Sequence, residues 1–169
     1  MNLRTGLGRY VPRDNVELTT NALTLHDLGE LIRRAGLRSG FIVETQFSVP
    51  RGESGKNVRK VDFVWLDESR PQKPVVAFEL EGRDVYPQSL KNDVSRLRAS
   101  DAKLKVLALY QVDHDRTMMG SPPYGCAPKA WVKRHVGAAK IVVFLDEELM
   151  AKDGIERVVT EARELAPRR

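Results

Sequence analysis

The segment 75–81, VVAFELE, is the feature that most constrains how this chain can fold. Its first four residues are apolar, as in a buried strand, and it ends in Glu79, Leu80 and Glu81. Because side chains alternate along a strand, Glu79 and Glu81 point to one side of the sheet and Leu80 points to the other. The chain is therefore expected to place two carboxylates on one face of a core strand, close to its end.

Segments with the patterns of strands and helices surround this one. The expected strands span residues 40–50, 58–66, 75–81, 104–112 and 140–146, and the expected helices span 24–36, 86–101, 129–137 and 155–166. Thr24 and Asp27 predict a capping pair for the first helix, and Gly36 is expected to end it. Residues 68–74 predict a turn. Residues 1–20 are polar and predict an N-terminal arm, followed by a single domain over 21–169.

The composition narrows the class of protein. With 41% hydrophobic residues the chain can form a hydrophobic core without the help of covalent cross-links. It has one cysteine, Cys126, so an intrachain disulfide is excluded. No run approaches the ~18 apolar residues of a membrane span, and the start has no apolar core of signal-peptide length. We therefore expect a cytoplasmic protein that does not enter a membrane. The formal charge of +5 permits binding to nucleic acid.

Asp62 supplies a third carboxylate, within the apolar strand segment 58–66. The connection from this strand to segment 75–81 is short, so the two strands are expected to pair as a hairpin that brings Asp62 beside Glu79. Carboxylates that converge in a partly dry place repel one another, so either their pKa values rise or a cation lies among them. Mg²⁺ takes oxygen ligands together with substrate phosphate, which predicts a site for phosphodiester hydrolysis.

This pattern resembles the PD-(D/E)xK nuclease superfamily. The motif reads here VDFVW, with Asp62, and AFELEG, with Glu79 and Glu81, and the resemblance covers residues 22–112. It implies an α/β fold with a restriction-endonuclease-like core of α-β-β-β-α-β order. The mixed central sheet would be flanked by helices, with an extra C-terminal strand and helix. It also implies a hydrolase, a metal-dependent endonuclease that cleaves DNA with Mg²⁺, for which Mn²⁺ would substitute.

The resemblance implies roles for particular residues. Asp62 and Glu79 would be the chief metal ligands. Glu81, at the place that most relatives give to lysine, would help to position the metal or the attacking water. Lys91 in the following helix, or Arg83, would stabilise developing negative charge.

Other residues are candidates for the edge of the site. The acidic residues that could complete it are Glu30 and Glu44, and the cations expected to contact nucleic-acid phosphates are Arg51, Lys56, Arg59, Lys60 and Arg83. DNA is the expected partner, and the resemblance leaves a homodimer open.

Two other classes of function remain open for this sequence. One is a non-catalytic module on the same fold that binds nucleic acid or a protein partner. The other is an unrelated α/β interaction protein, in which Glu79 and Glu81 are hydrated at a strand end and Lys91 lies on a solvated helix flank. Metal binding that depends on Asp62 would distinguish the nuclease from the non-catalytic module.

Overall fold

A computed structural model describes residues 24–49, 59–82, 87–110, 132–134, 136, 140–151 and 153–166. The expected N-terminal arm, residues 1–20, lies outside the described residues. The described elements are α1 (Leu25–Arg38), β1 (Ile42–Val49), β2 (Arg59–Asp67), β3 (Arg70–Glu81), α2 (Pro87–Ala99), β4 (Leu104–Leu109), β5 (Val142–Leu145), α4 (Asp146–Met150) and α5 (Gly154–Leu165). None of the helices in this part of the chain is long and apolar enough to span a membrane.

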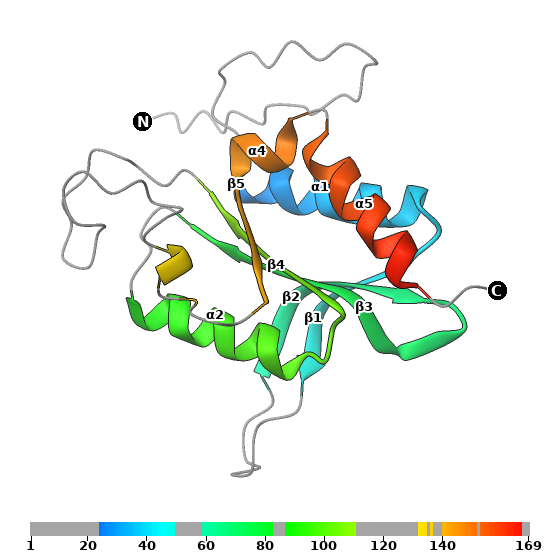
Figure 1. Cartoon of the computed structure of the whole chain (residues 1–169), viewed down its shortest axis with the longest axis horizontal. Helices are drawn as coiled ribbons and strands as arrows, with labels where there is room; N and C mark the ends of the chain where they lie inside the picture. Colours follow the sequence, from blue (N-terminus) through cyan, green and yellow to red (C-terminus); the bar gives the residue numbers. More distant parts are fainter. Residues whose placement is uncertain are drawn as a thin grey trace, which may run out of the picture.

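The strands form one mixed sheet in the order β1-β2-β3-β4-β5 (Figure 1). β1, β2 and β3 pair antiparallel, whereas β3, β4 and β5 pair parallel. A parallel neighbour requires a crossover connection, and α2 lies in the connection between β3 and β4. The chain is therefore an α/β protein with a mixed sheet, as expected.

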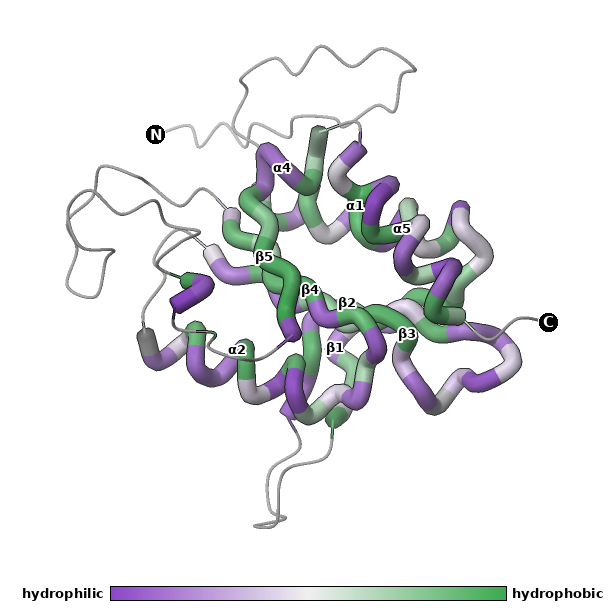
Figure 2. The backbone as a smooth tube through the Cα atoms, viewed as in Figure 1, coloured by the Kyte–Doolittle hydropathy of each residue, from purple (hydrophilic) through white to green (hydrophobic). Residues whose placement is uncertain are grey.

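Helices cover both faces of the sheet (Figure 1), and the strands between them are largely hydrophobic (Figure 2). On one face, α1, α4 and α5 pack against Trp65 and Phe78. On the other face, α2 packs through Leu90 and Leu97. These two residues belong to the apolar stripe that predicted the helix, which confirms how α2 meets the sheet.

Helix α1 begins as expected but ends later. Thr24 and Asp27 form a capping box, in which each side chain accepts a hydrogen bond from the other's backbone amide. The prediction that Gly36 ends the helix was wrong, because the helix continues to Arg38. Gly36 is instead a packing position, since a Cβ there would lie 2.5 Å from Nε1 of Trp65.

The start of β3 and the helix α4 also differ from the predictions. Only Glu68 and Ser69 form the turn expected over 68–74, and β3 already begins at Arg70. Proline is accepted in the first part of β3 because β4 pairs with β3 only from Val76 onward, so that edge needs no amide donors. The short helix α4 was not predicted, although its three leading acidic residues favour a helix N-terminus.

Gly36→Ala is expected to destabilise the protein by about 1–2 kcal/mol, because overpacking outweighs the better helix propensity of alanine. Trp65 cannot easily yield to a new Cβ. Its ring stacks on Phe41 at 5.6 Å between centroids, and its Nε1 donates a 3.2 Å hydrogen bond to the Ile32 carbonyl. Urea denaturation measures the change.

Gly82→Ala is the matched control, because a Cβ there would lie within 4 Å of no atom in the described part of the chain. It should leave the denaturation midpoint close to that of the parent. A Gly36→Ala protein as stable as the parent would show that this packing contact is not tight.

Candidate active site

Asp62 lies where β2 and β3 separate. The β2–β3 ladder ends at the pair of Phe63 and Phe78, and Asp62 is the neighbour of Phe63 just outside it. Beyond that pair, Oδ2 of Asp62 accepts a 2.9 Å hydrogen bond from the backbone amide of Leu80. The carboxylate therefore replaces a backbone acceptor between the two strands, which fixes its position.

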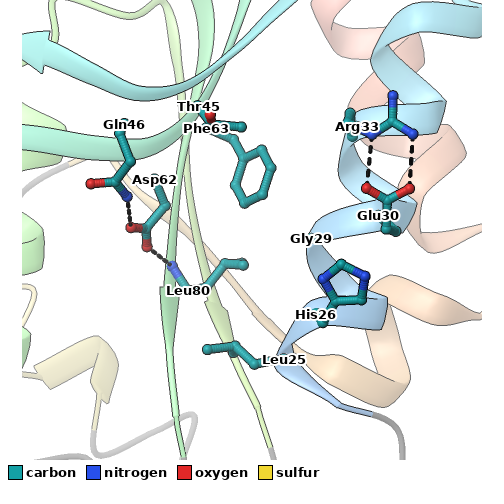
Figure 3. A pocket seen from close by; sticks show the side chains of 10 residues that line it. All are labelled: Leu25, His26, Gly29, Glu30, Arg33, Thr45, Gln46, Asp62, Phe63 and Leu80. Carbon is teal, nitrogen blue, oxygen red and sulfur yellow. Dashed lines mark hydrogen bonds and ion pairs between the residues drawn. The ribbon is translucent and has the colours of Figure 1, made fainter. Parts of the chain in front are cut away.

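Gln46 in β1 holds the other oxygen of Asp62. Its Nε2 donates a 3.1 Å hydrogen bond to Oδ1 (Figure 3). Gln46 has a φ of 53°, and it lies between the paired residues Thr45 and Phe47 without a ladder partner of its own. A non-glycine residue in this region costs about 1 kcal/mol or more, and such strain is concentrated at functional sites.

Glu79 is fully buried and is paired with Arg96 of α2. The guanidinium donates from Nε to Oε1 at 2.7 Å and from Nη2 to Oε2 at 2.9 Å, which is the bidentate geometry that arginine and carboxylates favour. Burial, opposed by Arg96 and reinforced by Asp62, raises the pKa of Glu79 to about 8. The expectation that Asp62 lies beside Glu79 is therefore confirmed.

Asp93 of α2 is a fourth carboxylate, which the sequence analysis missed. It is only 3% exposed, and its Oδ1 accepts a hydrogen bond from Nη2 of Arg96. Its Oδ2 is buried with no hydrogen-bond partner among the described residues. Burial, reinforced by the nearby carboxylate of Glu81, raises the pKa of Asp93 to about 9.

A sequence signal for Asp93 existed. It lies between Leu90 and Val94, within the apolar stripe of α2, where a carboxylate is buried by helical spacing alone. Arg96 follows three residues later, which puts a cation within reach along the same helix. A charged pair inside an apolar stripe is therefore the pattern that should have been sought.

Asp62, Glu79, Glu81 and Asp93 are called the acidic cluster below. Among the described residues, Arg96 is the cation that forms ion pairs with this cluster, through Glu79 and Asp93. Four carboxylates therefore lie near one guanidinium. As they stand, no three of the described acidic, histidine or cysteine side chains converge in a geometry that holds a metal ion. Arg96 occupies both oxygens of Glu79.

The other candidates from the sequence lie apart from the acidic cluster or outside the described residues. Lys91 is exposed on α2, and Glu44 is exposed on β1. Arg59 donates a hydrogen bond to the hydroxyl of Ser95 on α2, and Lys60 is exposed. The expected phosphate contacts Arg51, Lys56 and Arg83 lie outside the part of the chain that the structure describes.

Glu30 lies on α1, across a pocket from Asp62 (Figure 3). It forms an ion pair with Arg33, in which both contacts are 2.8 Å, and a second ion pair with Arg34 at 3.4 Å. The hydrogen bond from Arg33 lowers the pKa of Glu30. Glu30 is therefore an ionised residue on the wall of the pocket that Asp62 also lines.

Comparisons with known proteins assign no family to this chain. No protein-family model matches the sequence, and no curated protein shows a significant match. Among solved structures, the crystal structure of AF1548, a protein of unknown function, is similar with a TM-score of 0.43 and 13% identity. The match covers 83% of this chain and 67% of that one, and likeness at this level carries no functional argument.

In the absence of divalent metal, Asp93→Asn is expected to stabilise the protein at pH 8, because the folded state must keep on Asp93 a proton that the unfolded chain releases at this pH. The unfolded chain releases the Asp93 proton near pH ~4, whereas the folded state keeps it up to about pH 9. Between these values the folded state binds more protons, so stability falls as the pH rises. Asparagine removes this titration and can donate to Glu81.

Thermal melts from pH 5 to pH 9 in chelator measure this effect. The parent should lose stability more steeply with rising pH than Asp93→Asn does. Asp101→Asn is the control, because Asp101 is exposed and its φ of 55° suits asparagine. Parallel pH profiles for the parent and Asp93→Asn would contradict the proton at Asp93.

Proposed function

We propose that this chain is a metal-dependent nuclease of the PD-(D/E)xK type, acting on DNA phosphodiesters. The observation that carries the proposal is the imbalance of the acidic cluster, four carboxylates against the single guanidinium of Arg96. Such an arrangement requires either bound protons or a further cation. The described elements follow the order α1-β1-β2-β3-α2-β4, which is also the order of that superfamily's core. This order supports the proposal of a PD-(D/E)xK nuclease.

The donor set of the acidic cluster fits a hard divalent cation. Carboxylate oxygens are the ligands that Mg²⁺ and Mn²⁺ prefer. Asp62 and Glu79 would be the chief ligands, with Glu81 beside them, and Oδ2 of Asp93 is a buried oxygen that accepts no hydrogen bond from the described residues. The ion would supply a lowered pKa for an attacking water and stabilisation of charge on the phosphate.

The chain's own residues would then orient and balance this site. Gln46 and the amide of Leu80 hold the two oxygens of Asp62 in a fixed orientation. Arg96 holds Glu79 and Asp93 and is the cation of α2 nearest the site, so it is a better candidate than Lys91 for stabilising negative charge there. A metal ion would have to compete with Arg96 for Glu79.

A second candidate function is a non-catalytic module that binds nucleic acid or a protein. Both oxygens of Glu79 are engaged by Arg96, and both oxygens of Asp62 accept hydrogen bonds. An acidic cluster whose oxygens are hydrogen-bonded in this way could have a structural role only, with protons neutralising the remaining negative charge. Binding to DNA that is equal with and without metal favours this candidate.

Cleavage of plasmid, linear, branched and single-stranded DNA is expected with Mg²⁺ or Mn²⁺ and is expected to stop in chelator. Asp62→Ala and Glu79→Gln should each lower the rate by about 100-fold, because both remove a carboxylate from the metal site. Glutamine at position 79 can still accept a hydrogen bond from Arg96, which protects the fold. Glu161→Ala, on the exposed side of α5, is the matched control.

Thermal melts with and without Mg²⁺ accompany this assay. The parent should be stabilised by the ion through mass action, and Asp62→Ala should respond less. An equal response in the two proteins would remove Asp62 from the site. DNA that remains intact with every metal tried would favour the binding module.

Glu81→Lys is expected to lower cleavage activity, although most members of the PD-(D/E)xK superfamily carry lysine at this position. Glu81 is half-buried beside Asp93, so lysine would place a cation where the proposed metal ion would have a carboxylate beside it. Initial rates over a Mg²⁺ titration for the parent, Glu81→Gln and Glu81→Lys test this. A Glu81→Lys protein faster than the parent would identify position 81 as a decayed lysine position.

A further inference from the structure

The pocket beside Asp62 has no role in the chemistry proposed above. It lies between α1 and the strands β1, β2 and β3 (Figure 3), and it has a volume of about 470 Å³. Its size is within the range of small-ligand sites. Because Asp62 belongs to both the pocket and the acidic cluster, a ligand here would adjoin the reacting phosphate.

Phe63 gives the pocket a flat apolar surface. Its ring projects from the sheet toward α1, with Leu25 and Leu80 nearby (Figure 3). The ring approaches α1 closely because residue 29 is glycine, where a Cβ would lie 2.9 Å from Cζ of Phe63. The ring is only half-buried, so part of its surface remains available to a ligand.

Polar groups stand around this apolar surface. His26, Thr45 and Gln46 present an imidazole, a hydroxyl and an amide, which are donors and acceptors of the kind that read the edge of a base. The strained backbone of Gln46 brings its amide to this place. Arg33 in the pocket wall balances the charge of Glu30, so the negative charge of Asp62 remains and disfavours an anion there. A neutral heteroaromatic group therefore suits the pocket better than a phosphate.

We propose that this pocket holds an unpaired nucleoside next to the phosphate that is cleaved, with its base against Phe63. The inference rests on the proposed function and names its substrate class. A base within a continuous duplex is stacked and paired and cannot enter a pocket without being extruded. Single-stranded, frayed or branched DNA is therefore the preferred substrate, because its bases can stack on an aromatic ring.

The test is a cycle that deletes the base and the ring separately. The probes are a fluorescent 12-mer of thymidylate and an abasic 12-mer of the same backbone, with binding measured by anisotropy at low salt in Ca²⁺. The parent should bind the thymidylate chain about tenfold more tightly than the abasic chain, the contribution of about one stacked base. Phe63→Leu should reduce this preference toward onefold and leave the affinity for the abasic chain unchanged.

Two further variants make the cycle decisive. Phe47→Leu makes the same change on β1, where Phe47 packs with the α2-side core, and it should keep the tenfold preference. Leu25→Ala changes the opposite wall of the pocket at a position that is 41% exposed, so it tests the pocket without the risk of unfolding. It should lower the preference by a few-fold.

The outcomes separate this inference from the proposed function. A parent without preference for bases, or a preference that survives both Phe63→Leu and Leu25→Ala, overturns the nucleoside pocket. If metal-dependent cleavage persists in that case, the nuclease proposal stands alone. A base preference that depends on Phe63, found in a protein that cleaves nothing with any metal, supports the pocket and removes the nuclease.

Discussion

The buried ion pair between Glu79 and Arg96 is the interaction on which the centre of this structure depends. Burial of a lone carboxylate costs several kcal/mol, and the bidentate guanidinium offsets that cost by donating to both oxygens. The pair also joins β3 to α2, so the layer on that face of the sheet is held by charge as well as by apolar packing. Loss of Arg96 alone would leave a buried charge without compensation.

One guanidinium does not neutralise the carboxylates around it. In the absence of metal, bound protons neutralise part of the negative charge. The pKa values of Glu79 and Asp93 are raised accordingly. Metal and protons would compete for the same oxygens, so stability and any metal-dependent activity would respond to pH together. Asp62 lies between the separating strands β2 and β3 and also lines the pocket on the α1 side.

Much of the fold follows from local sequence pattern. Alternation and apolar runs predicted all five strands of the sheet, and helical spacing predicted α1, α2 and α5. The chain alone also placed Asp62 beside Glu79, because a short hairpin connection leaves few ways for β2 and β3 to pair. These features depend on near neighbours in the chain and on the two periods of regular structure.

The tertiary structure decided which distant groups meet. Gly36 was expected to end a helix, but it lies within the helix, where Trp65 of β2 packs against it. Lys91 was expected at the site, but Arg96 reaches Glu79, because the packing of α2 on the sheet selects which of its cations faces inward. The sequence by itself determined the elements and the carboxylates of β2 and β3, since periodicity and short connections are local. Only the folded chain determined their partners, since contacts between distant segments depend on how whole layers pack.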